Sequence, residues 1–149
     1  MPKKTRKHFF AYVTNNGSAT VSVIDTVTNT VVATIPVGLA PNGVVLTPDG
    51  KFAYVANWSS NTVSVIDTTT KTVVGSPIPI VSAPQGIGIT PDGKSVYVTA
   101  EPNAVVVIDT ATNAIVGPPS PLEIALLGSP SLQTGNTHMS RMRVLARSR

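Results

Sequence analysis

The chain contains no cysteine and few residues of the kinds that build catalytic sites. Without a thiol among its 149 residues, disulfide bonds and thiolate metal ligands are excluded. Its two histidines, His8 and His138, stand at opposite ends of the sequence, so we expect no histidine cluster. Charged residues make up only 12% and aromatic residues 5% of the chain. We therefore expect no bound metal or other cofactor.

Long apolar runs are also missing. The basic start MPKKTRKHFFAYV has an apolar stretch only from Phe9 to Val13. A secretory signal needs about 7–15 apolar residues in a row, and a membrane-spanning helix about 18. We expect neither an export signal nor a membrane span in this sequence, and the sequence leaves the compartment open.

Positive charge is concentrated at the two ends. Residues 1–7 carry four basic side chains and the last nine residues carry four more. Residues 8–140 hold three lysines against seven acids, a net charge of −4. Basic tails can bind nucleic acids or anionic membranes, but no aromatic side chains alternate with these charges to stack on bases. We expect a solvated tail at 1–7, a disordered tail at 128–149, and no nucleic-acid partner.

The residues that are abundant in the sequence are those that favour β-strands and turns. Hydrophobic residues make up 42% of the chain, and valine, threonine, glycine and proline are abundant. Valine and threonine favour strands, while glycine and proline favour turns. The length suits one domain, which we place at residues 8–127. The sequence predicts an all-β fold.

One phrase occurs three times. AYVTNNGSATVSVIDT is followed by AYVANWSSNTVSVIDT and then by VYVTAEPNAVVVIDT, so that Tyr12 recurs as Tyr54 and Tyr97 at steps of 42 and 43 residues. Each unit divides into four short apolar runs, which in the second unit are 43–46, 52–55, 63–66 and 72–74. Four antiparallel strands in about 42 residues are typical of a β-propeller blade. A β-helix is the alternative, although its rungs are usually shorter.

The phrases YVTN, VSVIDT and TPDG, which begin at Tyr12, Val21 and Thr47, resemble the YVTN family of β-propeller repeats over residues 9 to about 118. That family occurs in archaeal surface-layer proteins and in many exported or cell-surface proteins of bacteria. The resemblance implies a propeller fold and a cell-surface or extracellular location. It implies no catalytic residues, because the repeated motif is structural.

We label the strands of a blade a to d from the axis outward and expect about three blades. The first begins at strand b (residues 8–15), and two complete blades begin near Asn42 and Gln85, which makes eleven strands. Pro121, aligned with Pro41 and Pro84, predicts a twelfth strand within residues 122–130.

Three blades cannot close a ring, so blade edges and faces would be exposed and available for self-association. Two chains joined head to tail could form a six-bladed ring. Alternatively, the chain is part of a longer propeller. Both readings stay open at this point.

The strand order places the b–c and d–a loops on one side of the blades. Because the b–c loops differ between repeats, we expect them to carry any face for a protein or surface ligand. The candidate residues are Asn15, Asn16, Asn42, Trp58, Gln85 and Glu101. The alternative is that Trp58 packs on its own blade and the asparagines cap turns.

The repeated aspartates Asp25, Asp67 and Asp109 invite a metal or acid–base interpretation. Each stands in the same turn of a different blade, and Asp49 and Asp92 stand in the hairpin turns Pro-Asp-Gly. Catalytic carboxylate pairs must converge to within about 5–9.5 Å, as in glycosidases. We therefore expect all five aspartates to be structural turn residues.

The sequence favours a non-enzymatic propeller scaffold or interaction module. The alternative from another class is an enzyme of the propeller lactonase or lyase type with a polar site at the axis. The inner runs GVVLTP and GIGITP offer few groups for such a site. A further alternative is a fragment without an independent function.

Overall fold

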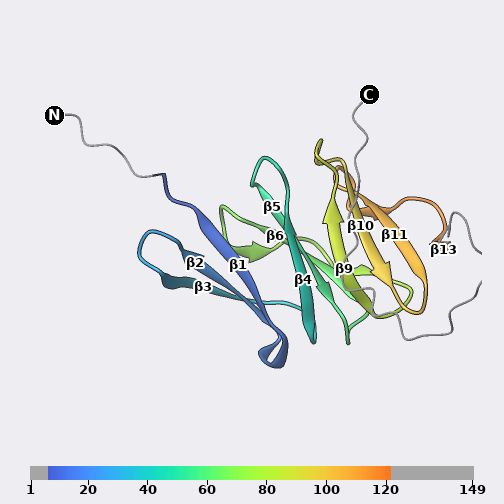
Figure 1. Ribbon diagram of the computed structural model, residues 1–149, viewed down its shortest axis with the longest axis horizontal. Helices are drawn as coiled ribbons and strands as arrows, with labels where there is room; N and C mark the ends of the chain where they lie inside the picture. The colour runs from blue at the N-terminus through green and yellow to red at the C-terminus, as the bar shows by residue number, and fades with distance from the viewer. Residues whose placement is uncertain (1–6, 122–149) are drawn as a thin grey trace, which may run out of the picture.

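The computed structural model describes residues 7–121, which form three antiparallel β-sheets standing side by side (Figure 1). The first sheet, blade 1, contains β1 (Phe10–Asn15), β2 (Thr20–Asp25) and β3 (Thr30–Pro36) in that order. One turn of 3₁₀ helix, η1 (Asn16–Ser18), joins β1 to β2. No helix within residues 7–121 is long and apolar enough to cross a membrane.

The other two sheets each contain four strands in chain order and one further short strand. Blade 2 consists of β4 (Pro41–Leu46), β5 (Phe52–Asn57), β6 (Thr62–Asp67), β7 (Thr72–Val73) and β8 (Ile78–Pro79). Blade 3 consists of β9 (Pro84–Ile89), β10 (Ser95–Ala100), β11 (Ala104–Asp109), β12 (Ala114–Ile115) and β13 (Ser120–Pro121). The predicted all-β blades with four antiparallel strands are confirmed.

The outermost strand is continuous only in blade 1. In blade 2 both β7 and β8 pair with β6, and in blade 3 both β12 and β13 pair with β11. The break falls at Gly75 and Gly117, each with a φ of 69°. Glycine adopts this left-handed conformation without steric cost and turns the chain out of the ladder. Two of the eleven expected strands are therefore divided.

The alignment of Pro121 with Pro41 and Pro84 is wrong. Pro121 pairs with the first residue of β11, as Pro79 pairs with the first residue of β6 and Pro36 with the first residue of β2. Pro121 therefore ends an outer strand. The error arose because the two connections between the described blades each have two prolines five residues apart, one ending strand d and one beginning strand a. The twelfth strand expected within 122–130 lies outside the described residues, as do positions 1–6 and 128–149 of the tails.

The hydrophobic core lies between the sheets. One cluster joins blades 1 and 2 through Val21, Val23, Ile35, Ala53, Val55 and Ile66. A second joins blades 2 and 3 through residues that include Tyr54, Val63, Val65, Val96, Val98, Val106 and Ile108. Side chains alternate along a strand, so β5 directs Val55 toward blade 1 and Tyr54 toward blade 3. Both faces of blade 2 are therefore buried, which explains why both are apolar.

The inner strands lie next to one another, β1 against β4 and β4 against β9. A Cβ added to Gly43 would stand 2.9 Å from Cγ2 of Ile87 in the neighbouring blade, so only glycine fits this approach. In blade 2, the inner edge of β5 pairs with β4. The corresponding strand of blade 1 is β1, and within residues 7–121 no strand pairs with its inner edge.

Candidate functional site

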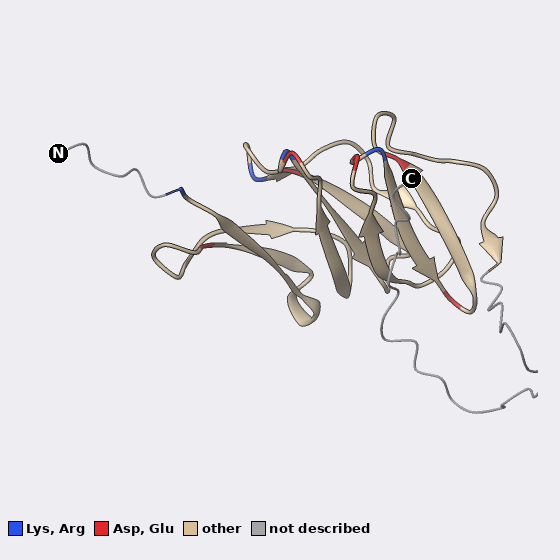
Figure 2. Cartoon of the chain, turned by 45° about the horizontal axis from the view of Figure 1, so that its top comes forward, with Lys and Arg blue, Asp and Glu red and all other residues tan. Residues whose placement is uncertain are grey.

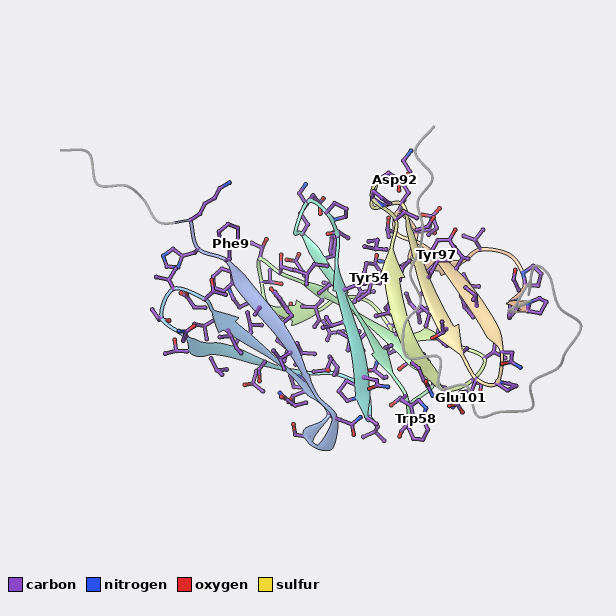
Figure 3. All side chains as sticks on the ribbon, in the orientation of Figure 1. Phe9, Tyr54, Trp58, Asp92, Tyr97 and Glu101 are labelled. Carbon is purple, nitrogen blue, oxygen red and sulfur yellow. The ribbon has the colours of Figure 1, made fainter. Side chains whose placement is uncertain are left out.

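The loops gather at two opposite ends of the blades. Figure 3 shows Trp58 and Glu101 at one end and Asp92 at the other. At the first end, the Trp58 N–H donates to the Ala40 carbonyl (3.0 Å) and the Glu101 N–H to the Ala83 carbonyl (3.4 Å), which ties each b–c loop to a d–a loop. We call these loops, residues 15–19, 37–42, 57–61, 80–85 and 100–103, the loop rim.

The side-chain amide nitrogen of Asn15 is engaged within its own hairpin. Its Nδ2 donates to Oγ1 of Thr20 (3.0 Å) and to Oγ of Ser22 (2.8 Å) in the adjacent strand. Asn57 makes the same pair of bonds in blade 2, at 3.1 and 2.9 Å. The amide therefore closes the end of the β-hairpin in both blades, in accord with the structural alternative for Asn15.

The other candidates are exposed on the loop rim. The structure brings Gln85 and Glu101 together, since the Gln85 side-chain amide donates to the Glu101 carboxylate. Asn42 is held through its backbone, where its carbonyl accepts from Oγ1 of Thr14 (3.2 Å). Asn16 lies in η1. These residues come from different blades, and only Gln85 and Glu101 bond to each other.

Trp58 is 42% exposed and has two apolar companions on the loop rim that the sequence reasoning missed. Leu39 is 62% exposed and Val81 69% exposed. Leu39 adjoins the Trp58 loop, because its N–H donates to Oγ of Ser60 (2.6 Å). Both could have been found in the sequence, because each is an apolar residue between the two prolines of a connection between blades.

The three repeated aspartates at the ends of the c strands hold turns. Oδ1 of Asp67 accepts from the backbone N–H of Thr69 at 2.8 Å, and Asp109 repeats this bond with Ala111 at 2.7 Å. Asp25 accepts from the Val27 N–H at 2.8 Å, which lowers the pKa of its carboxyl, with a further contribution from the nearby His8 ring. The expected structural role is confirmed.

The aspartates of the Pro-Asp-Gly turns are also engaged. Oδ1 of Asp49 accepts from the Thr47 hydroxyl (2.6 Å) and from the Lys51 N–H (3.0 Å), and these bonds lower the Asp49 pKa. Thr90 and Lys94 do the same for Asp92. Figure 2 shows the charged residues at the ends of the strands and not on the faces of the sheets. Within residues 7–121, no three histidine or acidic side chains gather as a metal site would require.

The outer face of blade 1 repeats a surface that blade 2 buries. Val13 and Val31 occupy the strand positions of Val55 and Val73, which pack in the blade 1–2 core. Val55 is fully buried, whereas Val13 is 44% and Val31 57% exposed. We call this surface end face 1; its residues are Ala11, Val13, Ile24 and Val31.

The outer face of blade 3 repeats the other surface of blade 2. Val96, Val98 and Val106 point into the blade 2–3 core, so the residues between them point outward. Val116 is 54% exposed, while its counterpart Val74 packs in the core. We call this surface end face 3; its residues are Tyr97, Val105, Val107 and Val116, the counterparts of Tyr54, Val63, Val65 and Val74.

A hydrogen bond crosses between blades 2 and 3. The Tyr54 hydroxyl donates to Oδ1 of Asn113 at 2.6 Å. Burial raises the pKa of Tyr54, and the charge of Asp109 adds to this. Burial and then Asp67 likewise raise the pKa of Tyr12. In each pair, the tyrosine of one blade lies against the c–d turn of the next.

The comparisons with solved structures decide the fold. The chain is similar to the hydrazine synthase of Kuenenia stuttgartiensis, with 35% identity, a TM-score of 0.70, and coverage of 72% of this chain and 31% of that one. It is also similar to the dihydro-heme d1 dehydrogenase NirN (22% identity, TM-score 0.65, 78% and 26% covered). A functionally unknown protein from Desulfotomaculum acetoxidans gives 23% identity and a TM-score of 0.59, with 72% and 36% covered. The fold is a partial β-propeller.

The sequence comparisons assign no family to this propeller. No family model matches the chain. The PE-PGRS family protein PE_PGRS18 of Mycobacterium tuberculosis is 62% identical over 37 residues, which is 25% of this chain and 8% of that protein. The chain spans 26–36% of the length of the solved chains named above.

Proposed function

We propose that the chain is a non-enzymatic interaction module that associates with further propeller blades through its two end faces. A single observation carries this proposal. Position for position, end face 1 repeats a surface that is buried in the blade 1–2 interface, since Val13 is 44% exposed where Val55 is 0% exposed. The chain therefore presents at its ends the two halves of an interface that it already forms internally.

The energetics favour such association. Complete burial of a valine side chain contributes roughly 1.5–3 kcal/mol relative to leaving it in water. Val13, Val31 and Val116 are each 44–57% exposed. Contiguous apolar surfaces of this kind usually mark interaction sites. Covering both end faces would add a favourable hydrophobic contribution to the free energy of association, of the kind that already stabilises the two internal interfaces.

The resemblance to YVTN repeats is consistent with a scaffold role at a cell surface, and we include this role in the proposal. The loop rim is the second part of the module, with Trp58 and Leu39 as its exposed apolar contacts for a protein partner. The lactonase or lyase alternative gains no support from the aspartates described above. The carboxylates of Asp49 and Asp67, for example, are already occupied by turn hydrogen bonds.

Sedimentation equilibrium over a range of protein concentrations tests the proposal. We expect the wild-type mass to rise above that of one chain, and we expect Val31→Lys to return it to the single-chain mass. Val81→Lys is the matched control, because Val81 is more exposed (69%) than Val31 (57%) but lies on the loop rim. A single-chain mass at every concentration, or equal disruption by both variants, would overturn the proposal.

A further inference from the structure

The bond between Tyr54 and Asn113 provides a template for end face 3, on which no further blade packs within residues 7–121. Asn113 occupies the fourth position after Asp109, where the chain is left-handed with a φ of 54°. Its N–H donates to the Asp109 carbonyl at 2.8 Å. This turn fixes the asparagine side chain at the height of the tyrosine hydroxyl of the preceding blade.

Blade 1 carries the same turn, and nothing within residues 7–121 lies in front of it as blade 2 lies in front of Asn113. Asn29 stands four residues after Asp25, has a φ of 54°, and donates its N–H to the Asp25 carbonyl at 2.8 Å. Asn29 is exposed. Blade 2 has Lys71 at this position. Among the described blades, Asn29 is therefore the only residue besides Asn113 that places a side-chain amide acceptor at this turn position.

Blade 3 carries the matching tyrosine. Tyr97 is the counterpart of Tyr54, and its neighbours Val96 and Val98 point into the blade 2–3 core, so Tyr97 points to the other side of the sheet, end face 3. Around it, Val105 and Val107 repeat Val63 and Val65. End face 3 thus presents the donor and the apolar surface that blade 2 presents to blade 3.

Each internal interface joins the tyrosine face of one blade to the opposite face of the next blade. The chain contains this heterologous pairing twice and contains no pairing of like faces among its described blades. Heterologous contacts close into rings when the rotation between copies permits. Continuing the internal pattern therefore places end face 3 of one copy on end face 1 of another.

We infer that the partner of end face 3 is end face 1 of a second copy of this chain, docked head to tail, with the Tyr97 hydroxyl donating to Asn29 Oδ1 of that copy. The inference rests on the proposed association through the end faces and names its partner and its polar contact. Two copies joined at both ends would bring six blades together.

Mixing two blocked variants tests the head-to-tail arrangement. Val31→Lys blocks end face 1 and Val116→Lys blocks end face 3, and both side chains are more than half exposed, so the fold should tolerate the change. A mixed dimer retains one intact interface, while a dimer of either variant alone retains none. We expect the mixture to reach a higher average mass than either variant. A mixture that associates no better than its components would overturn the inference.

A double-mutant cycle tests the polar contact. Tyr97→Phe and Asn29→Ala should each weaken association roughly 3- to 10-fold per interface, with no additional loss in the double variant. Tyr12→Phe is the control and should leave association unchanged, because Tyr12 faces blade 2. If the wild type stays a single chain, the proposed function itself fails. If it associates but the Tyr97 and Asn29 effects are absent or additive, only this inference fails.

Discussion

Gly38 lies directly against the side-chain amide of Asn57. A Cβ added to Gly38 would stand 2.7 Å from both Cγ and Nδ2 of Asn57. Asn57 is fully buried there, and its Oδ1 has no hydrogen-bond partner within residues 7–121. The corresponding positions of the next blade hold Val81 and Ala100, so the larger side chain is in the loop instead of the strand. The glycine makes room for the asparagine that closes the β5–β6 hairpin.

Gly38→Ala should therefore lower the free energy of unfolding by roughly 1–3 kcal/mol, since it overpacks a buried site. In an Asn57→Ala background the same change should cost much less, because the obstructing amide is gone. Chemical denaturation of the four proteins in this cycle measures both effects. Gly17→Ala is the control for a glycine with nothing within 4 Å. Equal costs of Gly38→Ala in both backgrounds would contradict this account.

Lys71 occupies a left-handed position, with a φ of 56°, where the other two blades have asparagine. Asparagine tolerates this conformation better than lysine. Lys71→Asn should raise the free energy of unfolding by up to about 1 kcal/mol. Thermal or chemical unfolding measures the change.

The Lys71 ammonium also lies 5.2 Å from the centre of the Phe10 ring, and its loss removes a cation–π contact of about 0.5–1 kcal/mol. The gain from Lys71→Asn should therefore be larger in a Phe10→Leu background. If Lys71→Asn lowers the free energy of unfolding in that background, the left-handed conformation of residue 71 is not what determines the effect of the substitution.

The Pro-Asp-Gly turns should make stability depend on acid pH. Hydrogen bonds from Thr47 and Thr90 and from nearby backbone N–H groups lower the pKa values of Asp49 and Asp92. A lowered pKa gives stability that is present above the ordinary Asp pKa of about 4 and is lost as the pH falls through the folded value. The free energy of unfolding should therefore fall below about pH 4. An Asp49→Asn, Asp92→Asn double variant should show a shallower fall, and a wild-type slope in that variant would rule out these two turns as its cause.

The interblade bond from Tyr54 to Asn113 should contribute measurably to the cohesion of the blades. Tyr54→Phe removes the hydroxyl and keeps the ring, so we expect a loss of about 0.5–1.5 kcal/mol in the free energy of unfolding. Tyr12→Phe is the matched control and should cost less, because blade 2 has Lys71, which offers no acceptor, at the position that corresponds to Asn113. If both changes cost the same, the hydroxyl of Tyr54 has no special role in joining blades 2 and 3.

The sequence predicts the repeated parts of this molecule well, because the repeats align with one another. The strand pattern, the two apolar faces of blade 2 and the turn role of Asp67 all follow from local residue chemistry. The division of the outer strand depends on the left-handed φ of Gly75, which a single glycine in the sequence does not specify. Pro121 was misplaced because only the pairing of β13 with β11 shows which proline of a blade connection it represents.

The candidate site was less predictable. Asn15 was chosen because it stands in a loop that differs between repeats, but its amide nitrogen donates to Thr20 and Ser22 across the hairpin, and this depends on strand register. Leu39 and Val81 were overlooked because their exposure follows from the path of the loops. The most informative surfaces, the end faces, required knowledge of which side of each strand is covered.

Thiol cross-linking tests the central claim most directly, because the chain has no cysteine of its own. A Tyr97→Cys variant is mixed with an Asn29→Cys variant and treated with a short bifunctional maleimide. A single chain carrying Tyr54→Cys and Asn113→Cys calibrates the reaction at the internal interface, where the two native side chains are 2.6 Å apart. The account predicts a covalent dimer in the mixture and little in either variant alone. A mixture that yields no more dimer than its separate components would contradict it.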